Sequence, residues 1–354
     1  MQKNYDLVVV GAGPAGASAA RAASRFGLHV LLIDASSHPE SPVQCAEFVP
    51  REVKKYVQLV PGAVVQDIQS MDLYIDEKRV SSLASSGYML NREVFDKSLV
   101  DRAVAAGTKF WPGTKAIART DSGLKVSRKG QDEYIQAKII IGADGPRSTV
   151  GQWMKSENQK YMAAIQYNLP LSYHQKSIDI YFKPEYEGGY AWFFPKGERA
   201  NVGVGVSLSH KDKLPQLMHE FIDDLAASGK ISGTQPAAKT GGLAPVGGPL
   251  AITQAGNMLL TGDAGGYTHP VTAGGIMTAI VTGEIAGKCA AQAIVNHDAG
   301  LLAQYPEQWK SLLGGFLDRA ARKRKDMDNH WTAHREQFEA LIKRTWIGAS
   351  EVGS

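Results

Sequence analysis

Cysteine is scarce in this chain of 354 residues, which contains only Cys45 and Cys289. Two thiols cannot form the disulfide framework of a small secreted protein, and they cannot supply the four ligands of a structural zinc site or an iron–sulfur cluster. The sequence therefore predicts a reducing, cytoplasmic environment and no metal site.

Long hydrophobic runs and a strong net charge are also absent. The longest apolar stretch, residues 274–295, is interrupted by Glu284 and Lys288, whereas a bilayer span needs about 20 apolar residues. No basic and apolar leader of a secretory signal occurs at the N-terminus. The formal net charge is only +4, so nucleic acid is not an expected partner.

The first 34 residues have the pattern of a dinucleotide-binding unit. Apolar runs at 5–10 and 29–34 predict two buried strands around an alanine-rich helix. Between them lie three glycines in G-x-G-x-x-G spacing, Gly11, Gly13 and Gly16, and the second strand ends at Asp34. Such glycines let a pyrophosphate approach the helix N-terminus, and the acid can bind a ribose.

The remaining chain reads as two kinds of structure. We expect a strand pair within 71–86, a helix over 91–107 capped by Asn91, a hairpin turning near Gly130, and a long amphipathic helical tail over about 300–346. Residues 160–210 are short strands separated by Gly/Pro turns, which is typical of an antiparallel sheet. Two further Gly-rich signals, "GADG" at 142–145 and "TGDAGG" at 261–266, each follow an apolar strand.

The order of these three Gly-rich motifs resembles the flavoproteins of the para-hydroxybenzoate hydroxylase fold. That resemblance implies FAD as cofactor, with the first motif at the ADP part, the second near the pyrophosphate and the third at the ribityl chain. The residues it assigns to FAD are Gly11, Gly13, Pro14, Ala15, Gly16, Asp34, Ala35, Gln44, Cys45, Arg92, Asp144, Gly145, Gly262, Asp263, Ala273, Gly274, Gly275 and Ile276.

Three segments resemble the geranylgeranyl reductase family more narrowly: "PVQCAEFVP", "GGYAWFFPKGERANVGVGV" and "TGDAGGYTHPVTAGGI". Members of that family reduce isolated C=C bonds of prenyl chains. The resemblance implies a hydrophobic, prenyl-type substrate, with NAD(P)H or a ferredoxin-like protein as electron donor. It places the substrate beside Tyr190, Trp192, Phe194, Gly203 and Gly205. An FAD-dependent monooxygenase or oxidase of a small hydrophobic or aromatic substrate is the alternative on the same fold.

The fold class expected from this resemblance is α/β. It comprises a Rossmann-type FAD-binding domain of the GR2 flavoprotein type, an inserted antiparallel-sheet substrate domain and a C-terminal helical region. We expect the FAD-binding domain at 1–70, 88–158 and 240–298, the substrate domain at 71–87 and 159–239, and the helical region at 299–354.

Cys45 has three interpretations that the sequence leaves open. It is a small buried residue, a proton donor or substrate-positioning group near the flavin, which the resemblance favours, or a covalent attachment point for FAD. Glu47 either tunes that thiol or faces solvent. His269 is a candidate acid, although a histidine in such a loop more often has a capping or packing role. Catalytic candidates are thus Cys45, Glu47 and His269.

A cluster of basic residues, "RAARKRK" at 319–325, stands out in the tail. A solvated charged face is the simpler interpretation. The alternative is attraction to a diphosphate head group or to an anionic membrane surface, which would make the protein peripheral to the membrane.

Overall fold

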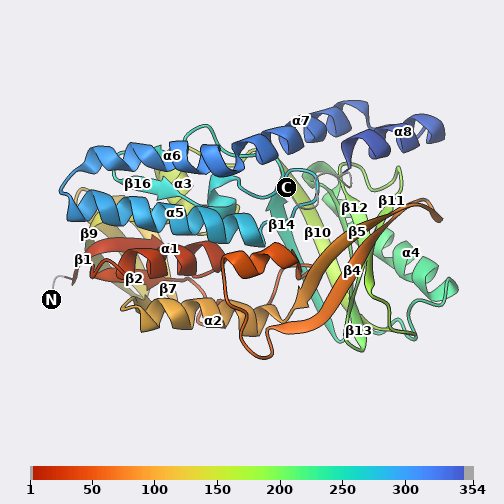
Figure 1. Ribbon diagram of the computed structural model, residues 1–354, viewed down its shortest axis with the longest axis horizontal. Helices are drawn as coiled ribbons and strands as arrows, with labels where there is room; N and C mark the ends of the chain where they lie inside the picture. Colours follow the sequence, from red (N-terminus) through yellow and green to blue (C-terminus); the bar gives the residue numbers. More distant parts are fainter. Residues whose placement is uncertain (1–2, 347–354) are drawn as a thin grey trace.

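Two β-sheets organise the chain, and a computed structural model describes them over residues 3–346 (Figure 1). They lie side by side along the long axis, and helices cover both. The first sheet has the order β15-β16-β9-β1-β2-β6, with β8 pairing to β9 and β7 to β8. Its strands are β1 (Lys3–Val10), β2 (Val30–Ile33), β6 (Lys109–Trp111), β7 (Thr114–Thr120), β8 (Gly123–Arg128), β9 (Gln131–Gly142), β15 (Gln254–Ala255) and β16 (Met258–Leu260).

The three Gly-rich motifs meet at one edge of this sheet. Strands β1, β9 and β16 are adjacent and parallel, with Val10 and Leu260 both in register with Gly142. Each motif directly follows one of these strands, so all three emerge at the carboxyl ends, where α/β sheets bind ligands. The apolar strands predicted before the motifs are confirmed. Strands β6 and β7 were not predicted, because neither segment carries a long apolar run.

Helices α1 (Pro14–Ser24), α2 (Arg92–Ala105) and α5 (Ile276–Val295) pack together beside the first sheet. Small residues allow the close crossing of α1 and α5: a Cβ on Gly283 would lie 2.2 Å from the Ala15 carbonyl oxygen, and one on Gly287 would lie 2.2 Å from that of Ala19. The predicted cap of α2 is confirmed, since the Asn91 side chain accepts a hydrogen bond from the Val94 amide.

The second sheet has the order β14-β10-β13-β12-β11-β4-β5-β3. Its strands are β3 (Phe48–Pro50), β4 (Val64–Ile75), β5 (Lys78–Leu90), β10 (Tyr161–Pro170), β11 (Ser177–Phe182), β12 (Tyr190–Lys196), β13 (Arg199–Ser207) and β14 (Ala238–Pro245). The expectation of a wholly antiparallel sheet is wrong at one place, because β11 pairs parallel to β4. The sheet also draws on residues beyond 71–87 and 159–239; the domain boundaries stay a prediction.

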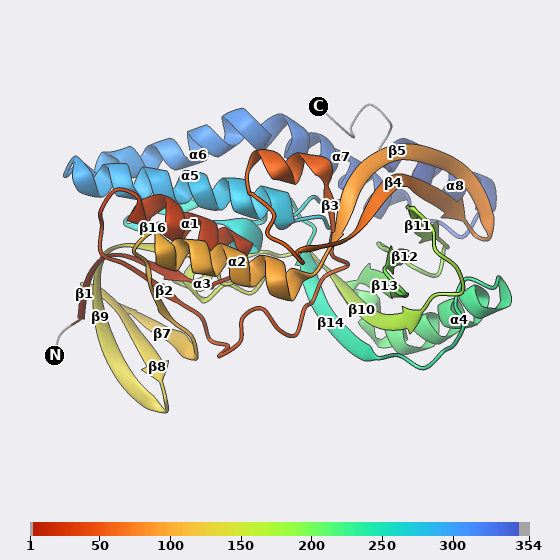
Figure 2. The same cartoon turned by 60° about the horizontal axis from the view of Figure 1, so that its bottom comes forward.

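Helices cover both faces of the second sheet (Figure 2). Helix α4 (Leu214–Ala227) packs on one face, whereas α7 (Gly315–His330) and α8 (Arg335–Thr345) cover the other. That second face carries Tyr190, Trp192 and Phe194 in one apolar cluster with Trp346. The prediction that alternate aromatic residues of this strand share a face is confirmed.

The predicted helical tail is confirmed up to residue 346, and residues 347–354 lie outside the described part. It consists of η4 (Ala299–Ala303), α6 (Gln304–Trp309), a π-helical turn η5 (Lys310–Gly314), α7 and α8. The shorter helices elsewhere are α3 (Thr149–Trp153), η1 (Arg51–Lys55), η2 (Leu208–Lys213) and η3 (Gly262–Gly265). No helix within residues 3–346 is long and apolar enough to cross a bilayer.

The basic cluster in α7 is not uniformly solvated. Arg319, Arg322 and Lys325 are exposed, but Arg324 is 3% exposed and pairs with Asp328 at 2.8 Å. A fully solvated face is therefore wrong for Arg324, because one face of α7 packs on the second sheet. Four consecutive basic residues on a helix cannot all point away from that contact.

Candidate active site

A cavity of about 500 Å³ opens at the edge where the Gly-rich motifs meet, a size within the usual range for ligand sites. Nine of the residues predicted to bind FAD line it: Gly11, Gly13, Pro14, Asp34, Ala35, Gln44, Arg92, Asp144 and Gly145. Three residues that also line it, Thr114, Lys115 and Ala116, were not predicted. They belong to β7, a strand with no sequence signal of its own.

The glycines of the first motif show that the cavity suits a pyrophosphate. A Cβ on Gly11 would lie 2.2 Å from the Ala143 carbonyl oxygen, and one on Gly16 would lie 1.8 Å from that of Gly11, so the protein itself requires both glycines. Gly13 differs, because no protein atom lies within 4 Å of its Cβ position and its φ is −66°. The open space at Gly13 is where a ligand can approach the backbone.

The start of α1 offers free donors to that space. Its N-cap, Gly13, provides no side-chain hydrogen bond, and no acidic residue occupies the first turn. Unpaired N–H groups and the positive end of the helix dipole therefore face the cavity, as anion binding requires. Asp34 lies beside them, fixed by hydrogen bonds from the amides of Ala12 at 2.7 Å and Ser36 at 2.8 Å.

Two further carboxylates anchor the second and third motifs. Burial raises the pKa of Asp144, although it accepts hydrogen bonds from the Ser148 hydroxyl and the Thr149 amide at the start of α3. Burial also raises the pKa of Asp263, which accepts a 2.7 Å hydrogen bond from the Thr268 hydroxyl. Each carboxylate is therefore held by hydrogen bonds within its own loop, and these are the two loops that are predicted to contact FAD.

Asn158 joins these two motifs and was missed in the sequence. Its side-chain amide donates to the carbonyl oxygens of Pro146, at 3.1 Å, and of Asp263, at 2.8 Å. A single asparagine thus fixes the separation of the "GADG" and "TGDAGG" loops. No local pattern marks an asparagine that works through tertiary contacts.

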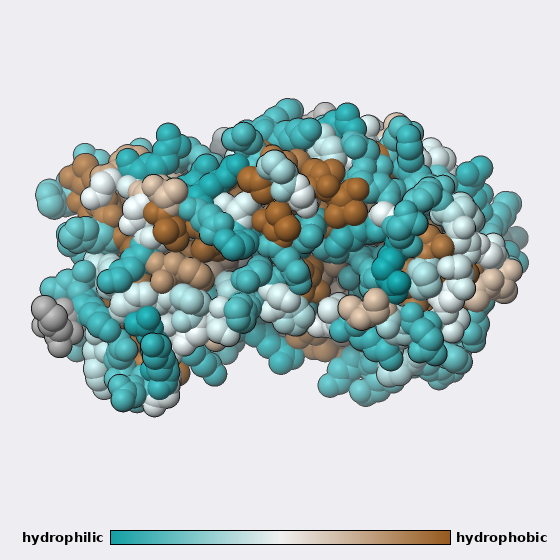
Figure 3. Space-filling view, turned by 90° about the horizontal axis from the view of Figure 1, so that it is seen from below, coloured by the Kyte–Doolittle hydropathy of each residue, from teal (hydrophilic) through white to brown (hydrophobic). Residues whose placement is uncertain are grey.

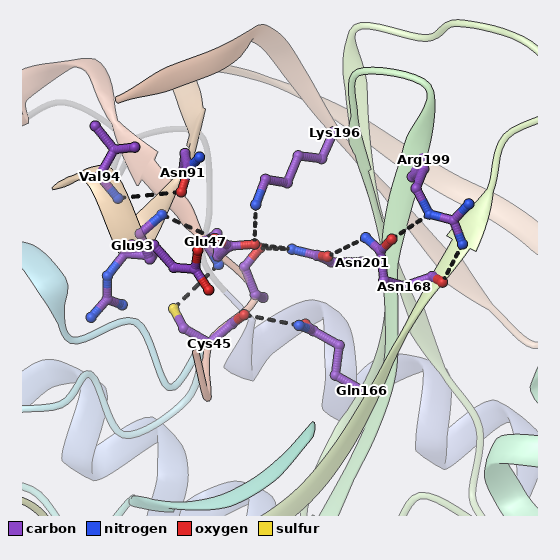
Figure 4. Close-up of polar contacts among 12 residues, drawn as sticks. Cys45, Glu47, Asn91, Glu93, Val94, Gln166, Asn168, Lys196, Arg199 and Asn201 are labelled. Atoms are coloured by element: carbon purple, nitrogen blue, oxygen red, sulfur yellow. Dashed lines mark hydrogen bonds and ion pairs between the residues drawn. The ribbon is translucent and has the colours of Figure 1, made fainter. Parts of the chain in front are cut away.

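Cys45 lies between the cavity and the second sheet (Figure 4). Its neighbour Gln44 lines the cavity, while Gln166 of β10 donates a 3.0 Å hydrogen bond to the Cys45 carbonyl oxygen. The Glu47 amide donates to the Cys45 sulfur at 3.2 Å. Burial raises the pKa of the Cys45 thiol, despite the nearby Arg92 guanidinium. The thiol is therefore protonated at neutral pH and can give up a proton.

Glu47 does not face solvent, so that alternative is wrong. The residue is 5% exposed, and Figure 4 shows its carboxylate pointing toward Lys196 and Asn201 of the second sheet. Its other oxygen accepts a 3.1 Å hydrogen bond from the Arg92 amide at the start of α2. Glu47 therefore links the second sheet to the start of α2, next to the thiol.

Trp192 and Gly203 are coupled by packing. A Cβ on Gly203 would lie 2.1 Å from the Trp192 ring, so only glycine leaves room for the indole. The indole N–H donates to the Gln166 side chain at 3.0 Å, and Gln166 in turn holds the Cys45 carbonyl oxygen. The space at Gly205 is filled by Met162, whose sulfur would lie 2.9 Å from an added Cβ. Substrate contact by these residues stays a prediction.

His269 and Tyr190 both hold the loop that precedes α5. The Nδ1 atom of His269 accepts a hydrogen bond from the Thr272 amide at 3.1 Å, and its ring packs at a tilt against Phe316, with centroids 4.9 Å apart. The Tyr190 hydroxyl donates to the Thr272 carbonyl oxygen at 2.5 Å. These contacts fit the loop-capping interpretation of His269, and its catalytic role stays a prediction.

Comparison with known families agrees with this arrangement. Residues 160–237 match the family model for the geranylgeranyl reductase catalytic domain, and residues 6–172 match that for lycopene cyclase protein. The chain is 34% identical to digeranylgeranylglycerophospholipid reductase 2 of Methanococcoides burtonii, over 89% of this chain and 82% of the relative. It is 36% identical to digeranylgeranylglycerophospholipid reductase 1 of Methanopyrus kandleri, over 86% of each.

Solved structures share the whole fold. A geranylgeranyl bacteriochlorophyll reductase-like protein of Thermoplasma acidophilum superposes with a TM-score of 0.80 at 24% identity, over 98% of this chain and 97% of its own. PqsL of Pseudomonas aeruginosa, in complex with 2-aminobenzoylacetate, superposes with a TM-score of 0.73 at 17% identity, over 96% of this chain and 100% of its own. At these identities the structural similarity establishes the fold alone.

Proposed function

We propose that this protein saturates C=C bonds in the prenyl chains of a lipid, because the chain belongs to the geranylgeranyl reductase family of FAD-dependent oxidoreductases. The observation that carries this proposal is the position of Cys45 between the Gly-rich cavity and the aromatic face of the second sheet. An isolated alkene has no carbonyl group to polarise it. Positioning, exclusion of water and a local proton donor must therefore supply the catalysis.

Each part of the site has a role in this proposal. The residues that line the cavity, together with the loop before α5, would hold FAD, which supplies the hydride for one alkene carbon. Cys45 gives its thiol proton to the other carbon and regains a proton from solvent. The apolar face with Tyr190, Trp192 and Phe194 binds the prenyl chain and excludes water.

The alternative monooxygenase function fits less well. PqsL, described as a probable FAD-dependent monooxygenase, resembles this chain at only 16–17% identity, whereas the relatives at 34–36% identity are named as reductases. A hydroxylase adds oxygen to its substrate and needs no proton delivered to a substrate carbon, whereas reduction of an alkene does need one.

Reoxidation of the reduced holoenzyme tests the proposed function. Under anaerobic conditions, we expect a digeranylgeranyl phospholipid to reoxidise the flavin and to gain two hydrogen atoms per reduced bond, measured by absorbance and mass spectrometry. The electron donor is NAD(P)H or a ferredoxin-like protein, and anaerobic addition of each to the oxidised enzyme distinguishes them. Failure of anaerobic reoxidation, together with an oxygen-dependent hydroxylated product, would overturn the proposal in favour of a monooxygenase.

We also propose peripheral contact with an anionic membrane, where the substrate resides. Arg319, Arg322 and Lys325 form an exposed basic stripe on α7, at the top of Figure 1. The apolar residues that gather near the middle of the face shown in Figure 3 lie on the opposite side, so the proposed contact rests on the basic stripe. The protein should co-sediment with anionic vesicles more than with zwitterionic ones, and high salt should reduce this difference. Replacing these three residues with glutamine should remove it. Sedimentation that ignores both lipid charge and salt would contradict the contact.

A further inference from the structure

The backbone of Glu47 has an uncommon conformation that the surrounding protein must hold. Its φ is 71°, in the left-handed region that residues other than glycine rarely adopt. The amide on one side of this torsion donates to the Cys45 sulfur, 3.2 Å away. Such a conformation persists only where neighbouring contacts fix it, and it is a reason to look for a role in the site.

Three donors from three elements fix the Glu47 carboxylate. One oxygen accepts from Lys196 Nζ at the end of β12, at 2.7 Å, and from Asn201 Nδ2 of β13, at 2.6 Å. The other accepts from the Arg92 amide at the start of α2. The Glu47 side chain is 6% exposed and that of Lys196 is 20% exposed, so this ion pair is shielded from water and its loss leaves a buried charge unpaired.

Further hydrogen bonds anchor these donors in the second sheet. The Asn201 side-chain oxygen accepts from the Asn168 amide at 3.2 Å, and Arg199 donates to both the side-chain and main-chain oxygens of Asn168. Figure 4 shows this row of contacts running from Arg199 to the thiol. The hairpin of β12 and β13 therefore determines where the segment around Cys45 can lie.

We propose that Lys196 and Asn201 are positioning residues, which hold the Cys45 thiol in its reactive orientation through the carboxylate and amide of Glu47. This inference rests on the proposed function, in which Cys45 is the proton donor. It adds that the donor is aligned by the strand hairpin that also carries Trp192. The geometry of the proton donor is thereby tied to the sheet that binds the substrate.

We call the contacts of Lys196 and Asn201 with the Glu47 carboxylate the Glu47 clamp. The charged groups around the thiol determine how loss of this clamp should change the pKa of Cys45. Arg92 lowers the pKa of Cys45, the Glu47 amide lowers it further, and the charges of Glu47 and Asp96 raise it. Tyr190 is a further titratable neighbour. The hydrogen bond from the Glu47 amide stabilises the thiolate, and releasing the segment around Glu47 removes that hydrogen bond. We therefore expect this release to raise the pKa of the thiol.

Alkylation of Cys45 tests this inference without any substrate. In the holoenzyme, the pH dependence of iodoacetamide labelling is followed by mass spectrometry of the Cys45 peptide. For Lys196→Met we expect the curve to move to higher pH, with labelling at neutral pH slowed by about three- to tenfold. Turnover should fall about tenfold at unchanged KM and FAD content. Lys196→Arg, which keeps the charged donor, should restore both.

The matched control is Lys183→Met, which breaks another lysine–carboxylate pair, with Asp224 at 2.6 Å, far from the thiol on the α4 side of the second sheet. It should change the melting temperature without moving the labelling curve. Asn201→Leu should shift the labelling curve in the same direction as Lys196→Met, but by less. It replaces Lys196→Met in the experiment if that variant fails to fold. A wild-type labelling curve in both Lys196→Met and Asn201→Leu would show that the contacts of these two residues with Glu47 are only structural. Because labelling needs no prenyl lipid, that result is distinct from failure of the proposed function.

Discussion

Cys45→Ala is expected to lower the rate of prenyl reduction by about 10²–10⁴-fold, the usual contribution of a positioned general acid. The variant should bind FAD normally, because the Cys45 side chain is not among the groups that line the main cavity. Reduction of the flavin by the electron donor should also be unaffected. Stopped-flow absorbance separates this half-reaction from reoxidation by the lipid, which alone should be slow.

Cys45→Ser provides the control for the chemistry. A hydroxyl keeps the size and the hydrogen bond from the Glu47 amide but gives up its proton far less readily than a thiol. We therefore expect the reoxidation rate of Cys45→Ser to resemble that of Cys45→Ala. Reoxidation at the wild-type rate in both variants would reduce Cys45 to a packing residue. Colourless protein in both variants would instead point to a role of Cys45 in holding FAD. Flavin that stays with the wild-type polypeptide on denaturation would then indicate covalent attachment, and flavin that is released would indicate binding alone.

Gly13→Asp is expected to abolish FAD binding while leaving the protein folded. No protein atom lies within 4 Å of the Gly13 Cβ position, and its φ of −66° suits any residue. Aspartate is also a better N-cap than glycine, so the free energy of unfolding of the apoprotein should stay the same or rise by a few tenths of a kcal/mol. The same carboxylate would occupy the space of the pyrophosphate and repel it.

The affinity loss should exceed about 100-fold, since a like-charge contact in a binding site costs several kcal/mol. Flavin fluorescence titration of the apoprotein measures it, and thermal unfolding of the apoprotein measures the effect on the fold. Gly233→Asp is the matched control: it adds the same charge where a Cβ meets only Pro170 at 3.4 Å, in the loop between α4 and β14. It should leave FAD affinity unchanged. If Gly13→Asp binds FAD with normal affinity, the first motif is not part of the cofactor site.

Local patterns determined several elements of this protein and the dinucleotide-binding character of its first motif. The apolar runs predict β1, β9 and β16, the glycine spacing predicts the turn into α1, and the cap at Asn91 predicts the start of α2. These features depend on neighbours within a few residues, so the sequence alone carries them. The same locality allowed the aromatic residues of β12 to be assigned to one face.

Tertiary structure alone decided how the site is assembled. The Gly-rich motifs meet because β1, β9 and β16 are adjacent, an order that no local pattern records. The Glu47 carboxylate is buried and paired because the fold brings it to Lys196 and Asn201, which lie about 150 positions away in the chain. Arg324 is buried because α7 packs on the second sheet. Burial and charge pairing depend on which surfaces meet, and those surfaces are set by the packing of the two sheets.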